Sequence, residues 1–92
     1  MISHTTERFR ELYGNLPKQI RKQTMQAYSQ FKSDPYYPGL HFKRIHSSRP
    51  IYSVRITKNY RAVGVQQNNE IIWFWIGSHS DYNKLMNQLR HG

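Results

Sequence analysis

The sequence predicts an α+β domain in which an N-terminal helical hairpin packs on a four-stranded, mainly antiparallel sheet, with a further helix at the C-terminal end. Two observations predict this class. Apolar residues recur at helical spacing up to about residue 32, whereas after residue 40 they fall into short runs separated by turn residues. Because 92 residues are the usual length of one domain, we assign one domain over residues 1–92.

Two helices are predicted at the N-terminal end. The first is expected to be capped by Thr5 or Thr6 and to end at Gly14. The second restarts at Asn15–Pro17, where proline suits a first turn, and runs to about Lys32. The apolar side of this second helix consists of Leu16, Ile20, Thr24, Ala27, Tyr28 and Phe31.

A loop with two prolines and a glycine separates the helices from the predicted strands. A short strand is expected within residues 40–45. Longer strands follow at 51–57, 60–67 and 70–76, and the last of these is apolar on both faces, which is typical of a central strand. The four residues before the first helix are too short to assign, although they could form a brief strand.

Asn68 and Asn69 can supply the positive φ angles of a two-residue hairpin turn. Small residues then face the two tryptophans of the last strand, which favours a core position for both tryptophans over a role in stacking on nucleobases. This turn sets Gly64 opposite Trp73, Ala62 opposite Trp75 and Arg61 opposite Ile76.

The chain is strongly basic. Fourteen Lys and Arg residues against five Asp and Glu residues give a formal net charge of +9 at pH 7. Self-repulsion of this size favours a polyanion or an acidic protein as partner. A general solubility surface is the less favoured interpretation, because such surfaces mix both signs of charge.

Several classes of protein are excluded by composition. The chain contains no cysteine, which excludes a disulfide scaffold and a cysteine nucleophile and fits a cytoplasmic location. No apolar run approaches the length of a membrane helix or a signal peptide. The five histidines lack metal-ligand spacing and the few carboxylates form no acid–base pair, so we expect no metal and no cofactor.

The remaining polar side chains suit the cleavage of RNA by its own 2′-hydroxyl group. This reaction needs a base, cations that stabilise charge on the phosphate, and an acid that protonates the leaving 5′-oxygen. Arginine and lysine supply the charge, while histidine and tyrosine transfer protons. Arg61, inside an aromatic strand, is costly to bury unless it meets an anion.

His79 follows the last strand after a glycine and a serine. Ser78 and Asp81 have the spacing of a capping box, which predicts that His79 lies in the first turn of a helix. A helix N-terminus attracts phosphate, which gives His79 a functional interpretation. An ordinary polar first-turn residue fits the position equally well. Tyr82 begins the apolar stripe of this helix, and its spacing alone favours packing over catalysis.

The order of these elements, with the segments PGLHFKRI, IYSVRITKNYRAVG and IGSHSDY, resembles the RelE/ParE superfamily of bacterial toxin–antitoxin toxins. The resemblance extends over nearly the whole chain. Its best signature is the block 51–64 followed by residues 77–79. The family implies a RelE-like fold, a toxin of a type II system and one of two targets. RelE-like members cleave mRNA, whereas ParE-like members inhibit DNA gyrase.

The resemblance also implies roles for individual residues. Arg61 matches a recurrent arginine of the nuclease branch, and His79 matches a position that holds histidine or arginine. Tyr82 resembles the aromatic residue that follows, at a different spacing. His41 is a candidate general base, because this chain lacks the glutamate of one branch near residues 38–40. The expected phosphate-binding cations are Lys43, Arg44, Arg49, Arg55 and Lys58.

The sequence therefore predicts a metal-independent endoribonuclease that cleaves mRNA, on the ribosome, with no membrane association. The expected protein partner is an acidic cognate antitoxin, through which the complex could oligomerise. Two alternatives stay open: a ParE-like gyrase inhibitor without nuclease activity, and a non-toxic nucleic-acid-binding member of the fold.

Overall fold

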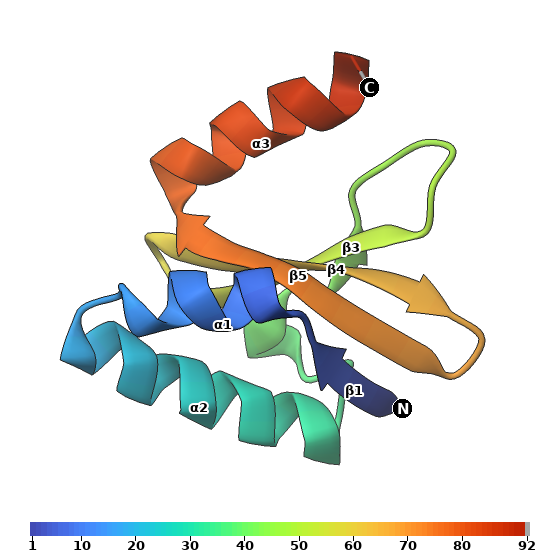
Figure 1. Ribbon diagram of the computed structural model, residues 1–92. Helices are drawn as coiled ribbons and strands as arrows, with labels where there is room; N and C mark the ends of the chain where they lie inside the picture. Colours follow the sequence, from blue (N-terminus) through green and yellow to red (C-terminus); the bar gives the residue numbers. More distant parts are fainter. Residues whose placement is uncertain (92) are drawn as a thin grey trace.

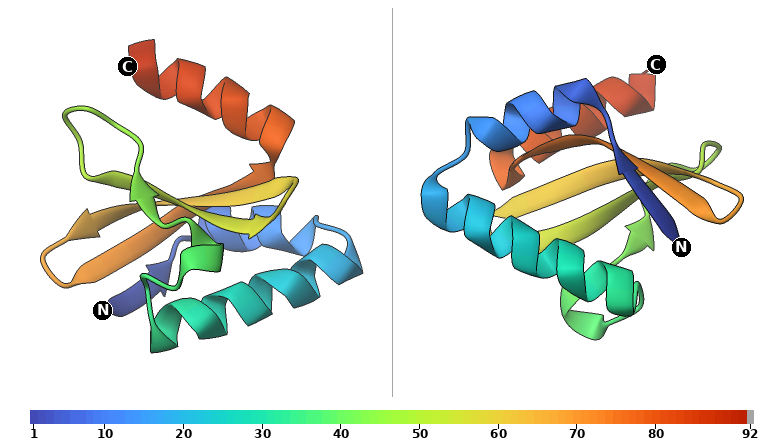
Figure 2. Two further views of the ribbon diagram at one scale, coloured as in Figure 1. Left: turned by 180° about the vertical axis from the view of Figure 1, so that it is seen from behind. Right: turned by 60° about the horizontal axis from the view of Figure 1, so that its bottom comes forward.

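The computed structural model describes residues 1–91 and places a mixed sheet between two layers of helix (Figure 1). Helices α1 and α2 cover one face of the sheet, and α3 stands over the opposite face (Figure 2). The elements in chain order are β1 Ile2–Thr5, α1 Glu7–Gly14, α2 Lys18–Ser33, the 3₁₀ helix η1 Pro38–Leu40, β2 Lys43–Arg44, β3 Ile51–Thr57, β4 Tyr60–Gln67, β5 Glu70–Ser78 and α3 His79–His91.

The predicted α+β class is confirmed, but the sheet has five strands where four were predicted. Their order is β1-β5-β4-β3-β2. Strand β1, which was too short to assign from the sequence, runs parallel to β5, while the other pairs are antiparallel. Backbone bonds from Ile2 N–H to the Asn69 carbonyl and from Thr6 N–H to the Trp73 carbonyl extend this pairing at both ends of β1. Strand β5 is therefore an interior strand between β1 and β4, as its apolar faces indicated, although β4 is the middle strand of the five.

The observed boundaries of α1 and α2 lie close to the predicted ones. Thr6 caps α1 by accepting a hydrogen bond of 3.1 Å from the Phe9 amide, and α1 ends at Gly14. Helix α2 ends at Ser33, one residue beyond the predicted end. Pro17 is the N-cap of α2, so it lies just before the first turn in which it was expected.

Two local features differ from the prediction in detail. The short strand expected within residues 40–45 exists but spans only Lys43 and Arg44, because Leu40 ends η1 and His41 adopts a left-handed conformation with φ of 48°. In the β4–β5 turn only Asn68 has a positive φ, of 55°, although both asparagines were expected to. Residue propensities do not show which of two adjacent asparagines adopts the positive φ angle.

The hydrophobic core lies between the sheet and helices α1 and α2. Phe31 of α2 packs edge-to-face on Trp73, with ring centroids 5.3 Å apart. The Trp73 indole N–H, 2.9 Å from Ser3 Oγ, finds its partner on β1. The fully covered members of this core are Phe31, Leu40, Val54, Ala62, Ile71, Trp73 and Ile76.

A β-bulge changes the second half of the β4–β5 pairing. Gly64 pairs with Trp73 as predicted, but the next pair is Val63 with Trp75, so Phe74 is an extra residue on β5. Consequently Ala62 lies opposite Ile76 and Arg61 lies opposite Gly77, and the predicted partners of both were wrong. The core position expected for Trp75 was also wrong, because the bulge turns this side chain to the other face, where it is half-buried.

Candidate functional site

The sheet face opposite α1 and α2 carries the cations of β3 and β4. Arg55 on β3 and Arg61 on β4 are direct cross-strand partners, with Gly77 of β5 next in the same row. Both arginines are half-buried. Like charges directly opposite each other destabilise a sheet, so this pair stabilises the fold less than two neutral residues would. An anion shared by the two guanidinium groups would remove that cost.

Arg61 also organises the β3–β4 turn. Its Nη1 atom donates to the carbonyls of Thr57 at 2.7 Å, Tyr60 at 3.0 Å and, more weakly, Lys58 at 3.4 Å. All of its hydrogen bonds to described residues come from this one nitrogen. The remaining N–H groups of the guanidinium are therefore available to a ligand.

Burial lowers the pKa of Arg61 from its ordinary value, and the positive charge of Arg55 lowers it further. The phenol of Tyr82 on α3 raises the pKa of Arg61, so its side chain lies within electrostatic reach of the guanidinium. An arginine stays charged despite such shifts. The site therefore holds two permanent cations close to a phenol.

Helix α3 begins beside this pair. Ser78 Oγ accepts a hydrogen bond of 3.2 Å from the Asp81 amide, so the predicted N-cap is confirmed. The His79 amide donates to the Asn59 carbonyl at 2.7 Å and joins the helix to the β3–β4 turn. Two of the first amides of α3, those of His79 and Asp81, are thus already bonded within the chain.

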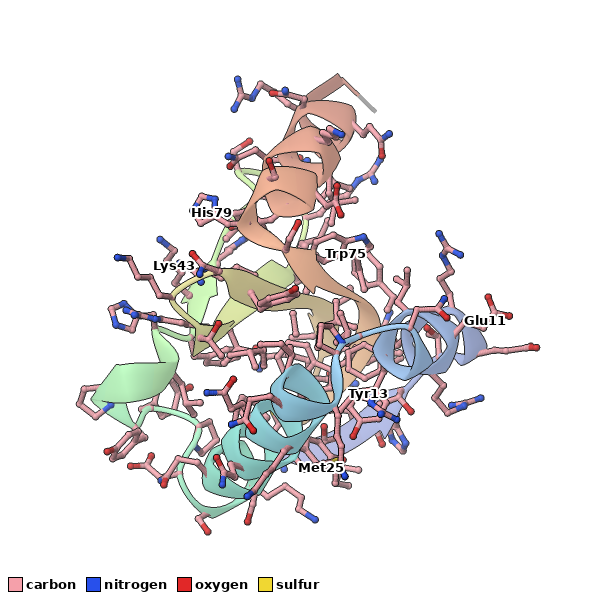
Figure 3. All side chains as sticks on the ribbon, turned by 90° about the vertical axis from the view of Figure 1, so that its left-hand side faces the viewer. Glu11, Tyr13, Met25, Lys43, Trp75 and His79 are labelled. Atoms are coloured by element: carbon pink, nitrogen blue, oxygen red, sulfur yellow. The ribbon has the colours of Figure 1, made fainter. Side chains whose placement is uncertain are left out.

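The His79 and Tyr82 rings are neighbours on the first turn of α3, with centroids 5.9 Å apart in an edge arrangement. His79 is exposed, and its Nδ1 lies 3.4 Å from the side-chain amide nitrogen of Asn83. Tyr82 is half-buried and also lies near the Trp75 ring, at 6.4 Å. Figure 3 shows His79 and Lys43 on the same side of α3, and Trp75 on the other side of its base.

A cleft of about 690 Å³ separates α3 from β2 and the loop that follows it. Tyr82 belongs both to this cleft and to the surroundings of Arg61, so it connects the two groups of cations. The remaining lining residues come from the segment 43–48 and from α3: Lys43, Arg44, Ile45, His46, Ser47, Ser48, Met86, Leu89 and Arg90.

The other candidate residues are distributed around this centre. Arg44 lines the cleft, but its Nε atom donates to the carbonyls of His46 and Arg49, so it shapes the 45–50 loop. Lys58 is exposed in the β3–β4 turn, and Arg49 is exposed in the 45–50 loop. His41 is exposed after η1 and is not among the residues that line the cleft.

A family model described as a ParE-like toxin domain matches residues 18–84 of the chain. The chain belongs to this family. It is therefore a type II toxin of the RelE/ParE superfamily, as its sequence motifs predicted. A comparison with curated protein sequences found no match.

Solved structures with the same fold are toxins of this superfamily. A RelB–RelE antitoxin–toxin complex from Methanococcus jannaschii gives a TM-score of 0.73 at 17% identity, covering 89% of this chain and 96% of the other. A YoeB/ParE toxin from Agrobacterium tumefaciens gives 0.68 at 14% identity, covering 86% and 99%. The isolated E. coli RelE toxin gives 0.64 at 13% identity, covering 95% and 96%. These likenesses establish the RelE-like fold.

One continuous segment of the toxin carries uncompensated positive charge. Residues 35–69 contain six of the fourteen Lys and Arg residues but no Asp or Glu, and this segment supplies every strand and loop cation of the site. In the described residues 1–91, Glu11 and Asp81 form ion pairs with Arg8 and Lys84, and Glu70 lies 3.8 Å from the His4 ring. Within the same residues no cluster of three metal-ligating side chains exists, and no helix has the length and hydropathy of a membrane span.

Two ionisable residues that line the cleft of the toxin were not predicted as site residues from the sequence. His46 lies in the 45–50 loop and bonds to the backbone of α3, and Arg90 lines the cleft from the last turn of α3. A basic residue in a last helical turn is common enough to carry no functional signal. The partner of His46 is 43 residues away in the sequence, so no local pattern could reveal the contact.

Proposed function

We propose that the toxin is a metal-independent endoribonuclease that cleaves mRNA, with the scissile phosphate bound between the Arg55–Arg61 pair and the first turn of α3. The observation that carries this proposal is the arginine pair itself. Two half-buried arginines face each other across β3 and β4, and a tyrosine and a histidine are the next neighbours. This combination favours a phosphodiester over any neutral ligand.

The reaction uses the 2′-hydroxyl of the RNA as nucleophile. A base removes its proton, the 2′-oxygen attacks phosphorus, and the P–O bond to the 5′-oxygen breaks as that oxygen is protonated. Arg61 and Arg55 stabilise the charge that develops on the phosphate oxygens. His79 and Tyr82 are the proton-transferring groups within this site. His41 remains a candidate base only if RNA binding brings it to the cleft.

The cations around this centre would hold the rest of the RNA. Lys43 enters the cleft from β2, and Lys58 and Arg49 are exposed on the turn and loop beside it. Positive charge along such a path binds the RNA backbone without reading its sequence. We propose the ribosome as the place of cleavage, because a chain of charge +9 is attracted to an RNA-walled site.

The proposed protein partner is an acidic cognate antitoxin in the cytoplasm. Related toxins have been crystallised as RelB–RelE complexes, from Methanococcus jannaschii and from E. coli among others. An acidic partner would offset self-repulsion and cover the cations of the RNA site, while its apolar anchors would supply most of the affinity. Co-expression with the neighbouring small open reading frame, followed by copurification and rescue of growth, tests this partner.

The second candidate function is inhibition of DNA gyrase, and the ParE-like description of the matching family favours it. Expression of wild type beside His79→Ala, with RNA ends mapped in the cells, separates the two functions. We expect new mRNA ends and growth arrest with wild type and neither with His79→Ala. Growth arrest with intact mRNA, together with inhibited supercoiling by the purified protein, would instead establish the gyrase inhibitor.

A further inference from the structure

His46 joins two distant parts of the chain at the edge of the cleft. Its Nε2 atom lies 3.2 Å from the carbonyl oxygen of Leu89 on α3, although the two residues are 43 positions apart. Its Nδ1 atom accepts hydrogen bonds from the backbone amides of Ser48, at 3.2 Å, and Arg49, at 3.0 Å. One imidazole ring therefore contacts both the 45–50 loop and the last turn of the helix.

These partners allow only one protonation state of the His46 ring. A carbonyl oxygen can only accept a hydrogen bond, so Nε2 must carry the proton. The two backbone amides can only donate, so Nδ1 must keep its lone pair. The neutral Nε2–H tautomer satisfies all three groups, whereas the other tautomer and the charged imidazolium do not.

Helix α3 has few other restraints. None of its residues 79–90 is fully buried, and its apolar side chains Tyr82, Leu85, Met86 and Leu89 are all half-buried. Its first turn is held by the Ser78 cap and by the bond from His79 to Asn59. The Leu89 carbonyl lies in the last turn, where carbonyls lack an amide partner within the helix. His46 supplies that partner.

We propose that His46 is a positioning residue that fastens the last turn of α3 to the 45–50 loop. It does so only as the neutral Nε2–H tautomer. Its function is to fix the spacing between the two walls of the cleft, with Tyr82 on one wall and Lys43 on the other. It acts through α3 and does not itself contact RNA. The proposal rests on the proposed function only in taking this cleft as part of the RNA site.

The surroundings of His46 agree with this tautomer. Lys43 and Arg44 line the cleft from the β2 side, Arg90 and the phenol of Tyr82 line it from α3, and no carboxylate lines it within residues 1–91. A proton on Nδ1 would direct an N–H group at the Ser48 and Arg49 amides, which can only donate. The C-terminal end of α3 attracts positive charge, but it is reached through Nε2, which already donates. The contact therefore requires an unprotonated Nδ1.

The protonation state can be measured directly on the full chain by ¹⁵N NMR of the histidine rings. We expect the His46 ring to show a protonated Nε2 and an unprotonated Nδ1 at neutral pH. The Ser48 and Arg49 amide resonances should shift in His46→Ala, because both amides lose their acceptor. An Nδ1–H tautomer in wild type, or loop amides that do not shift in His46→Ala, would overturn the proposal.

Matched variants test the effect on α3. With His46→Ala, hydrogen-exchange protection of the amides of Gln88, Leu89 and Arg90 should fall by about five- to tenfold, the effect of one lost hydrogen bond. His46→Gln offers both a donor and an acceptor, so protection should be largely kept. His4→Ala, which removes an exposed histidine on β1, should change nothing in α3.

The same variants separate this proposal from the proposed function. If wild type and His46→Ala protect α3 equally, the positioning role is refuted whether or not the toxin cleaves RNA. If α3 protection falls as expected but wild type leaves RNA intact, the positioning role stands and the nuclease function fails. With both correct, cleavage by His46→Ala should fall at least fivefold, and His46→Gln should restore it.

Discussion

The two faces of the sheet differ in almost every physical property. The face under α1 and α2 contributes only apolar residues to the core, and Val54, Ala62, Trp73 and Ile76 on it are all at most 4% exposed. The face under α3 carries Arg55 and Arg61 in direct opposition, and the helix above it has no fully buried residue in the range 79–90. The second face also buries Ile51 and Val63, so it contributes to folding as well. The larger apolar core lies on the first face, which allows the second to hold cations that do not stabilise the fold.

The bulge at Phe74 changes which side chains of β5 lie on each face of the sheet. Without it, Ile76 would lie with Arg61 on the α3 face and Trp75 would enter the core. With it, Ile76 is buried beside Ala62, and the small residue Gly77 lies opposite Arg61. An apolar strand thus ends at the cationic face without covering it.

The largest expected effect is a contrast between the two tryptophans. Trp73→Ala should lower the free energy of unfolding by about 3–5 kcal/mol, because it removes a fully packed ring and its bond to Ser3. Trp75→Ala should cost about 1–2 kcal/mol, because its half-buried ring loses less area. Urea unfolding of both variants measures this contrast, and equal losses would show that the α3 face is part of the same core.

The second contrast is between two arginines that bind backbone carbonyls. Arg61→Ala should reduce RNA cleavage by at least about a hundredfold, the typical cost of losing a charged transition-state contact. Arg61→Lys should also be impaired, since a lysine cannot bind both the turn carbonyls and a phosphate in a planar arrangement. Single-turnover cleavage of a defined RNA provides the measurement.

Arg10 on α1 is the matched control for Arg61. Its Nη1 donates to the Thr5 carbonyl at 2.8 Å, so Arg10→Ala removes a similar structural bond on the other side of the molecule. Cleavage should remain within about twofold of wild type, since surface substitutions rarely cost more than 0.5 kcal/mol. If Arg10→Ala were as damaging as Arg61→Ala, loss of fold would explain both results.

Two glycines extend the comparison to substitutions that add volume. A Cβ atom on Gly64 would lie 2.9 Å from the Ile72 carbonyl oxygen and 2.8 Å from the Trp73 ring, and the backbone cannot move away easily. Gly64→Ala should therefore cost about 1–3 kcal/mol. On Gly77 the Cβ would meet only the outer ring of Trp75, at 2.7 Å, and this half-buried ring can shift.

Gly77→Ala should for that reason cost less than Gly64→Ala, and thermal unfolding monitored by circular dichroism ranks the two variants. The reverse order would indicate that Trp75 is held as rigidly as Trp73. Gly77 lies opposite Arg61, so Gly77→Ala adds a methyl group beside the arginine pair. RNA cleavage by this variant also reports whether the proposed phosphate site needs a position without a side chain there.

The sequence predicted the elements of the fold better than their pairing. The Thr6 and Ser78 caps, the end of α1 at Gly14 and the two long strands 51–57 and 60–67 all follow local rules of capping and periodicity. The bulge at Phe74 and the parallel strand β1 depend on contacts between distant segments. No local pattern contains that information.

The candidate site divides in the same way. Arg61 and His79 could be selected because each breaks a local pattern, one as a cation in an apolar strand and the other as the residue after a capping serine. The sequence could not show that Arg61 binds three turn carbonyls, or that Arg55 is its direct partner. His46 was missed because its role depends entirely on a partner on α3.

The smallest expected effect concerns single exposed lysines on the two sides of the molecule. Lys58 lies in the β3–β4 turn beside Arg61, and Lys22 lies on α2. If the cationic face binds RNA, Lys58→Ala should weaken binding a few-fold and make the log–log salt slope shallower by about 0.7, the value for one contact with a single-stranded phosphate. Lys22→Ala should leave both affinity and slope unchanged. Neither variant should change the free energy of unfolding by more than about 0.5 kcal/mol, because both side chains are exposed.

Titrations with a short RNA that carries 2′-O-methyl groups measure this binding at several salt concentrations. Such an RNA lacks the nucleophile and is not cleaved, so the titration reports binding alone. Equal slopes for the two variants would mean that RNA is attracted by the net charge of the whole protein, and the distinction between the faces would then hold for folding but not for RNA binding.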